Sequence, residues 1–224
     1  PDTNQQLLEV TVDGKSIGTP ESYTYKNLTL NSRIVATFTG AMLFLDVRRE
    51  DWFYSDVRYV VEHGLFHGTT QDLFSPNAPM TRGMLVTVLY RLAGSPKAAE
   101  NSGFADVAAG KYYADAVAWA AESGIVSGVS DGRFAPDSQV TREQLAAILY
   151  RYARDKRYDT DKTADLTGFA DYEQISGYAA EALDWANAEG LVSGRSKTAL
   201  SPQGQATRAE VAAILHRFAE NVAK

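Results

Sequence analysis

The chain repeats itself three times, and this repetition constrains its fold more than any other feature. The segments TRGMLVTVLYR, TREQLAAILYR and TRAEVAAILHR begin at Thr81, Thr141 and Thr207. A glycine stands 17 residues before each threonine, at Gly64, Gly124 and Gly190. A fixed spacing of this kind is typical of tandem units that pack against their neighbours and bury a shared core.

Each unit has the pattern of a helical hairpin. It begins with an F-x-D turn, continues with a helix that ends at the glycine, and passes through a loop that contains Pro76, Pro136 or Pro202. The threonine then opens a second helix, which we call the TR helix. In the second unit its apolar residues follow the i, i+3, i+4, i+7 spacing of an amphipathic helix, at Leu145, Ile148, Leu149 and Tyr152.

The first helix of each unit differs from the TR helix in its side chains. In the second and third units its alanines run around most of the circumference, as in YYADAVAWAAESG. A helix without a polar face favours burial on most sides, and small side chains let neighbouring helices approach closely. We therefore expect the first helices at the centre, packed against one another, with the TR helices outside them.

The arginine after each threonine needs a separate explanation. Thr141 with Gln144 and Thr207 with Glu210 fit a capping box, whereas Thr81 keeps only the threonine half. These motifs do not explain a cation in the first turn of a helix, where the helix dipole disfavours positive charge. The three arginines concerned are Arg82, Arg142 and Arg208.

Two explanations stay open at this level. Each arginine could pair with an acidic neighbour and pin adjacent hairpins together, the candidates being Asp46, Asp106 and Asp171. Alternatively, the guanidinium and the free amides of a helix start could form a pocket for a carboxylate or phosphate. The spacing alone does not separate a structural clamp from a ligand clamp.

Aromatic residues also recur at equivalent positions. Trp119 and Trp185 match Tyr59, and a second set consists of Trp52, Tyr112 and Tyr178. Aromatic stripes on helices usually belong to the core. If they were partly exposed beside an arginine, however, they would offer a flat face to a sugar ring.

Residues 1–40 have a different pattern, with β-branched and aromatic alternation in LLEVTVDGKSIG, ESYTYKNL and NSRIVATFT. The Asp13-Gly14 pair predicts a hairpin turn, and the segment predicts two to four short strands. Because the chain begins within a strand-like pattern, we expect it to be a fragment of a longer protein whose export signal lies upstream.

Composition excludes several classes of function. The chain has 22 Lys and Arg against 28 Asp and Glu, with no basic run, so nucleic acid is a poor partner. No apolar run approaches the roughly 20 residues of a membrane span. The absence of cysteine excludes disulfides and thiolate metal sites.

Nothing in the sequence indicates a metal, a cofactor or catalysis. The histidines His63, His67 and His216 lack metal-ligand spacing, and the aspartates of residues 154–168 lack the glycine and terminal glutamate of an EF-hand. We interpret 154–168 as a solvated linker. No Ser/His/Asp order and no Gly-rich phosphate loop is present.

Several motifs recur in the same order in the three units, complete in some units and partial in others: F-x-D-V, an alanine-rich helix with tryptophan, G-I/L-V-x-G, and T-R-A-E before an aliphatic helix. This pattern resembles the S-layer homology repeat over about residues 43–222. It implies a mainly α fold in which three hairpins form a pseudo-threefold spindle around a central helix bundle. We divide the chain into a β segment, 1–40, similar to the end of a bacterial extracellular β repeat, and repeats at 43–97, 103–156 and 168–222.

The resemblance also implies a function. Modules of this family anchor exported proteins to the bacterial cell wall by binding an anionic secondary cell-wall polysaccharide, commonly a pyruvylated one, in grooves between repeats. It implies an extracellular, non-enzymatic module at the S-layer, monomeric and without a cofactor. The expected ligand-binding residues are Arg82, Arg142, Arg208, Asp46, Asp106, Asp171, Trp119 and Trp185.

The first repeat departs from the family pattern, with TRGM in place of TRAE and Tyr59 in place of the tryptophan. We expect its groove to be weakened or differently specific. Two other functions remain as alternatives: a protein-interaction or self-assembly module, and a wall-modifying enzyme, which would need paired carboxylates or a metal trio that the sequence does not display.

Overall fold

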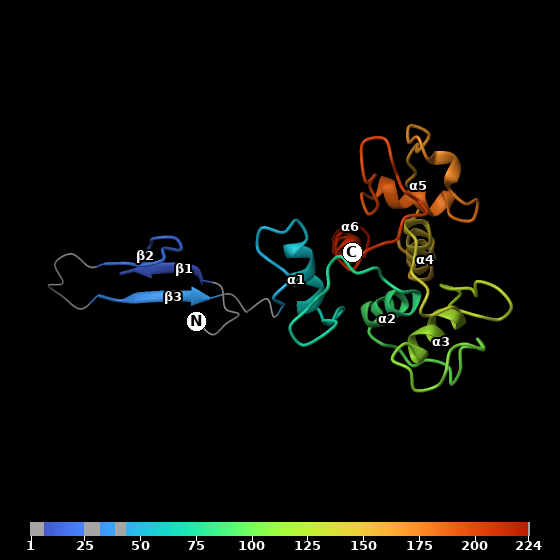
Figure 1. Ribbon diagram of the computed structural model, residues 1–224, viewed down its shortest axis with the longest axis horizontal. Coiled ribbons are helices and arrows are strands. Elements are labelled where there is room, and N and C mark those ends of the chain that lie inside the picture. Colours follow the sequence, from blue (N-terminus) through green and yellow to red (C-terminus); the bar gives the residue numbers. More distant parts are fainter. Residues whose placement is uncertain (1–6, 25–31, 39–43, 224) are drawn as a thin grey trace. The chain divides into compact units, whose positions relative to one another are not determined.

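The computed structural model describes residues 7–24, 32–38 and 44–223. The chain divides into two compact units, one formed by residues 1–48 with 68–74 and the other by 49–67 with 75–224. Within the described ranges there are six α-helices and three strands, so the prediction of a mainly helical protein with a small N-terminal sheet is confirmed (Figure 1). None of these helices combines the length and apolar character that a membrane crossing requires.

The smaller unit carries an antiparallel sheet. Strand β1 (Leu7–Val12) pairs with β2 (Lys15–Ser16) on one edge and with β3 (Ile34–Phe38) on the other. Asp13 and Gly14 both adopt positive φ, 50° and 81°, as a two-residue hairpin turn requires. The turn prediction is therefore confirmed. Of the predicted strand ESYTYKNL, residues 21–24 are not extended into a strand, and 25–28 lie outside the described residues.

The larger unit contains all the described α-helices. The first helices of the three repeats are α1 (Tyr54–Glu62), α3 (Ala114–Glu122) and α5 (Ala180–Ala188). The TR helices are α2 (Arg82–Leu92), α4 (Arg142–Asp155) and α6 (Arg208–Asn221), and a short 3₁₀ turn, η1 (Tyr172–Gln174), precedes α5. Each first helix ends before a glycine with φ between 67° and 70°, a conformation that glycine adopts without strain.

The threonine caps form as predicted. Both halves of the capping box are present at Thr141 and Thr207, whereas Thr81 only accepts a hydrogen bond from the amide of Met84. Each TR helix therefore begins at the arginine.

The arrangement of the helices corrects our expectation. Helices α2, α4 and α6 gather in the middle of this unit, and the first helices lie around them (Figure 1). In the described part, no first helix packs extensively against another; α3 packs on α2, α5 on α4, and α1 on α6. The TR helices are not one-sided after all, because small residues such as Ala146 and Ala212 on their second face are completely buried.

Main-chain hydrogen bonds explain why the TR helices converge. The amide of Val140 donates to Met80, that of Ala206 donates to Val140, and that of Met80 donates to Ala206, over distances of 2.8 to 3.0 Å. All three residues are completely buried. This closed ring joins the residues just before the TR threonines, and it is the pattern that a pseudo-threefold arrangement would produce.

Candidate ligand-binding grooves between repeats

Each TR arginine reaches into the next repeat. Arg82 Nε donates to the carbonyl of Phe134 (2.9 Å) and its Nη2 to that of Ser127 (3.4 Å). Arg142 makes the equivalent bonds to Leu200 (3.1 Å) and Ser193. Arg208 Nη2 donates to the carbonyl of His67 (2.7 Å), and this bond closes the cycle.

These bonds make the arginines structural clamps whose partners differ from those we expected. The three side chains belong to residues that are only 5–6% exposed. Burial lowers the pKa of Arg82 and Arg142 from its ordinary value, although guanidinium groups stay protonated in proteins. A cation in the first helical turn is therefore stabilised by carbonyl oxygens of the neighbouring repeat.

The helix starts do not provide the free amides that the ligand-clamp alternative required. In α4, the amide of Arg142 donates to Gly204 (2.9 Å), that of Glu143 to Pro202 (3.0 Å), and that of Gln144 to its threonine cap. The first two amides of α2 and α6 likewise donate to carbonyls of the neighbouring repeat. That part of our expectation was wrong, because loop carbonyls occupy the place of the anion.

The aspartates of the F-x-D turns serve a different purpose from pairing with these arginines. Asp171 accepts hydrogen bonds from the amides of Leu200 (2.8 Å) and Ser201 (2.7 Å), and Asp106 accepts the equivalent pair in its own repeat. Asp46 accepts from the amide of Phe74 (2.8 Å). Asp106 and Asp171 thus hold the loops whose carbonyls bind the arginines.

The pKa values of these carboxyls reflect the same bonds. The amide of Leu200 chiefly lowers the pKa of Asp171 from its ordinary value, against the opposing effect of burial. Burial alone would raise the pKa of Asp106, but hydrogen bonds from Phe134 and Ala135 outweigh it, so the pKa is lowered.

A cavity of about 350 Å³, which we call the Arg82 groove, opens beside Arg82. Arg151 and Gln144 of α4 form one wall, the loop 126–129 forms another, and Tyr178 of the third repeat completes it. None of the described lining residues is acidic. Within the described structure, Nη1 of Arg82 and the whole guanidinium of Arg151 have no hydrogen-bond or ion-pair partner.

Tyr178 is held in place at this groove by a buried carboxylate. Its hydroxyl donates to Glu143 (2.9 Å), which also accepts from the amide and the hydroxyl of Ser176. Glu143 is 2% exposed. Burial, and then this hydrogen bond, raise the pKa of Tyr178 to about 12, so the ring stays a neutral aromatic surface beside Arg82.

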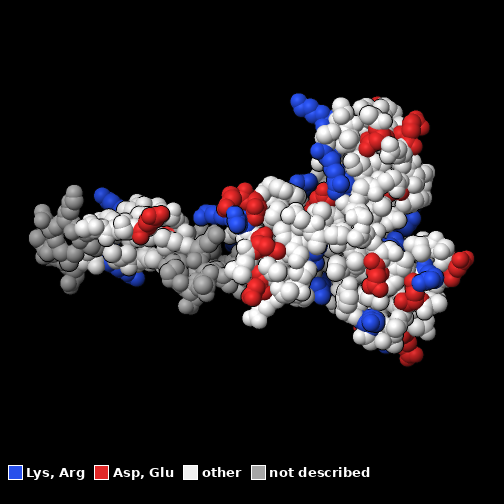
Figure 2. All heavy atoms as spheres, in the orientation of Figure 1, with Lys and Arg blue, Asp and Glu red and all other residues white. Residues whose placement is uncertain are grey.

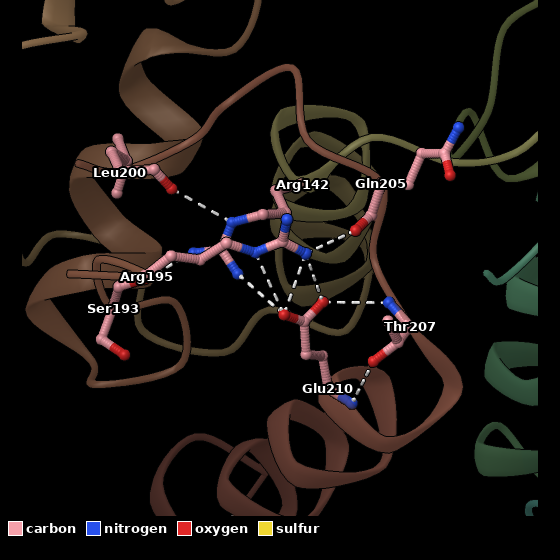
Figure 3. A network of polar contacts seen from close by, with 7 residues as sticks. All are labelled: Arg142, Ser193, Arg195, Leu200, Gln205, Thr207 and Glu210. Carbon is pink, nitrogen blue, oxygen red and sulfur yellow. Dashed lines mark hydrogen bonds and ion pairs between the residues drawn. The ribbon is translucent and has the colours of Figure 1, made fainter. Parts of the chain in front are cut away.

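A second cavity, of about 240 Å³, forms the Arg142 groove. Trp52 of the first repeat and Arg217 of α6 line it, together with Arg142, Arg195 and Glu210. Figure 3 shows the last three joined in one network: Glu210 lies 3.9 Å from Arg142 Nη1 and within 3.0–3.2 Å of Nε and Nη2 of Arg195. This groove therefore already contains a carboxylate.

Comparison with known proteins identifies the repeats. The model of the S-layer homology domain matches residues 43–83, 103–146 and 168–212. The chain belongs to the S-layer homology domain family. The resemblance predicted from the motifs is thereby confirmed.

Relatives of this S-layer homology chain include proteins of several names. It is 32% identical to the surface-layer 125 kDa protein of Lysinibacillus sphaericus over 74% of this chain and 14% of that protein. It is 30% identical to an amylopullulanase of Thermoanaerobacterium thermosulfurigenes over 83% of this chain and 10% of that enzyme. It is 22% identical to an S-layer protein of Bacillus thuringiensis subsp. finitimus over 85% of this chain and 25% of that protein. The chain spans about a tenth to a quarter of the length of these relatives.

Family membership and the surface-layer relatives place the chain at the bacterial cell surface, as the sequence predicted, and support a role in anchoring a surface protein to the cell wall. The relatives with enzyme names match this chain over only a small share of their own length, so those names assign no catalysis to the S-layer homology repeats.

The aromatic residues of the S-layer homology repeats fall into two groups. Trp119 (5% exposed) and Trp185 (1%) lie in the core, where they pack on Tyr90 and Tyr150, so neither offers a ring face to a sugar. The second set is exposed at 54–62%, and two of its members line the cavities; the set consists of Trp52, Tyr112 and Tyr178.

Sequence reasoning missed other lining residues. Arg151 and Arg217 each stand nine residues after the TR arginine of their repeat and match Arg91 of the first repeat, a periodicity that could have singled them out. At the Arg208 joint, Arg91 Nη1 donates to the carbonyl of Leu65 (2.9 Å), so this arginine already has a partner inside the protein.

The face drawn in Figure 2 shows acidic and basic side chains interspersed over the helices. In its described part, this face has no extended basic surface, so an anionic ligand would be attracted by the arginines of a groove and not by the face as a whole.

Proposed function

We propose that the chain anchors a surface protein by binding an anionic secondary cell-wall polysaccharide, one that carries pyruvate ketals, in the grooves between its repeats. The observation that carries this proposal is the Arg82 groove, in which two guanidinium groups face a cavity with no acidic residue among its described lining. A cavity of this charge favours a ligand with an acid group.

The donors of this groove suit a carboxylate. Nη1 of Arg82 and the guanidinium of Arg151 present planar N–H groups of the kind that bind carboxylates in pairs. A hydrogen bond that involves a charged group contributes about 1.5–3 kcal/mol. Because the clamp bonds fix Arg82 before any ligand arrives, little side-chain entropy is lost on binding.

The remaining walls suit a sugar that bears a ketal. Tyr178 offers a ring face to a hexose, and Val129, Ala147 and Ile148 provide apolar surface beside the cations. A pyruvate ketal places a methyl group and a carboxylate on the same carbon, so it would use both kinds of surface at once.

The residues named from the sequence take different parts in this proposal. Arg82 would contact the ligand with Nη1, which the clamp bonds do not use, and Arg142 and Arg208 would contact it at the other two joints. Asp46, Asp106 and Asp171 would act indirectly, through the loops that they hold. Trp52 and Tyr178 would contact the sugar ring in place of Trp119 and Trp185, which are buried.

Binding of a polymer by one rigid module has a further advantage. A polysaccharide that repeats its acidic sugar can engage more than one groove, or rebind before it diffuses away. Modest affinity at each groove is then enough to hold a protein on the wall.

The test is calorimetry with purified pyruvylated wall polysaccharide and with the same polymer after mild acid has removed its ketals. We expect the chain to bind only the first. Arg151→Ala should weaken binding about tenfold or more, which corresponds to a loss of about 1.4 kcal/mol, because this side chain has no described partner inside the protein. Lys97→Ala, a change of an exposed cation in the link between repeats, should bind as the parent does.

The outcomes are distinct. If the unaltered chain does not bind the pyruvylated polymer, the proposal is overturned. Equal binding of both polymers would show that the acid group is not what the grooves recognise.

A further inference from the structure

We propose that the Arg82 and Arg142 grooves are not equivalent, and that the third residue of the following TR helix decides which of them takes the ligand's acid group. That residue is Gln144 at the Arg82 groove and Glu210 at the Arg142 groove. The inference rests on the proposed function and specifies which of its sites is open.

Glu210 occupies the position of an acidic ligand in the Arg142 groove. Arg195 donates to both carboxylate oxygens, from Nη2 at 3.0 Å to each and from Nε at 3.2 Å to Oε1. Oε1 also lies 3.9 Å from Arg142 Nη1, and Oε2 accepts the amide of Thr207 (2.9 Å). Figure 3 shows the carboxylate enclosed by these donors.

The Arg82 groove has the same framework without that carboxylate. Gln144 Oε1 accepts the amide of Thr141 (3.2 Å), so it completes its capping box as Glu210 does, but it brings no charge. Val129 stands at the position equivalent to Arg195. The two side chains that fill the Arg142 groove with an internal ion pair are therefore both replaced by neutral ones.

The energetic consequence follows from the exchange that binding requires. In the Arg82 groove, a ligand carboxylate meets two guanidinium groups that have unused donors. In the Arg142 groove it must either separate Glu210 from Arg195 and Arg142 or lie beside Glu210 and use Arg217 alone. The first course exchanges one carboxylate for another, and the second adds a like charge nearby, so neither favours tight binding.

This assignment reverses our expectation for the first repeat. The TRGM departure led us to expect a weakened or differently specific groove for the first repeat, but Gln144, which lines the Arg82 groove, comes from the TR helix of the second repeat. The Met84 substitution therefore does not alter the Arg82 groove.

The reciprocal pair Gln144→Glu and Glu210→Gln tests the inference. The probe is the methyl glycoside of a hexose that carries a 4,6-pyruvate ketal, because it bears one acid group and cannot bridge two grooves. In calorimetry we expect Gln144→Glu to weaken binding at the Arg82 groove about tenfold or more, and Glu210→Gln to add one site of similar affinity to those of the parent chain. Both side chains complete a capping box in this protein, so both variants retain a suitable residue for the helix start.

A second measurement shows which groove is occupied. The Nε–H groups of Arg82 and Arg142 are hydrogen-bonded and buried, so their NMR signals should be observable during a titration. We expect the Arg82 signal to shift at lower probe concentrations than the Arg142 signal. The reverse order would overturn the inference even if one of the variants folded poorly.

The failure of this inference differs from failure of the proposed function. If the probe and the polymer both leave the parent chain unbound, the proposed function is wrong. If the parent binds but neither exchange at positions 144 and 210 alters affinity or site number, the function stands and the inequivalence of the grooves is refuted.

Discussion

His216 in α6 stacks on Tyr59 in α1, with ring centroids 4.1 Å apart and the rings inclined by 20°. This contact joins the last repeat to the first. At the other two joints the equivalent pairs are Tyr90 with Trp119 (5.6 Å) and Tyr150 with Trp185 (5.3 Å). One aromatic pair therefore recurs wherever a TR helix meets the first helix of the next repeat.

We predict that His216→Ala weakens the joint between α1 and α6. The change removes the stack on Tyr59 and the 2.8 Å contact between His216 Nδ1 and Asp56 Oδ1, so the free energy of unfolding should fall by about 1–3 kcal/mol. Urea unfolding at pH 7 measures the loss. His216→Tyr, which restores the residue found at the other two joints, should recover at least half of it; equal losses for the two variants would show that the stack does not stabilise the joint.

We next predict that the clamp arginine and the groove arginine differ in their effects on stability. Arg82→Ala removes two hydrogen bonds and leaves the buried carbonyl of Phe134 without this donor, so the free energy of unfolding should decrease by about 2–4 kcal/mol. Arg151→Ala removes no described bond and should change stability by less than about 0.5 kcal/mol. Thermal and urea unfolding of both variants provide the comparison, and an unchanged Arg82→Ala variant would contradict the clamp.

A third prediction concerns acid. Because its pKa is lower in the folded protein than the ordinary value, Asp171 contributes stability that is present above about pH 4 and is lost as the pH falls through the folded pKa. At pH 7, Asp171→Asn should therefore be less stable by about 1–3 kcal/mol, since the amides of Leu200 and Ser201 lose a charged acceptor.

The pH series gives the check on this third prediction. Unfolding of the parent and the variant at pH 7, 5 and 3 should show the difference between them shrinking toward the lowest pH. Asp137→Asn, a change at an exposed position that has no described hydrogen bond, should follow the parent throughout. A difference between parent and Asp171→Asn that stayed constant with pH would mean that the carboxylate charge is not what holds the loop.

The sequence predicted what local patterns determine. The hairpins, the threonine caps at Thr81, Thr141 and Thr207, and the glycines at which the first helices end all follow from short-range spacing, and the structure contains each of them. It could not predict which helices lie at the centre. That choice depends on the ring of main-chain bonds through Met80 and Val140, and main-chain groups leave no signature in the side-chain pattern.

The site was predictable in part for the same reason. The recurrence of Arg82 and its equivalents singled out residues that join neighbouring repeats, but their clamp partners include the carbonyls of Phe134 and Leu200, which no pairing of charges could suggest. The alignment also found both aromatic sets. Only packing shows that Trp185 is buried while Tyr178, seven residues earlier in the same repeat, faces a groove.

The last prediction uses the buried indole of Trp185. Its Nε1 is fully buried and, within the described structure, has no hydrogen-bond partner, whereas Trp119 at the equivalent position has no such unsatisfied atom. Replacing either residue with phenylalanine removes apolar contacts. At Trp185 it also removes a buried donor whose lack of a partner destabilises the folded state by about 1–3 kcal/mol. We therefore expect Trp119→Phe to lower the free energy of unfolding by about 1–2 kcal/mol more than Trp185→Phe does. Urea unfolding of the two variants under identical conditions decides the matter, and a larger loss at Trp185 would mean that its indole N–H has a partner, such as a buried water, in solution.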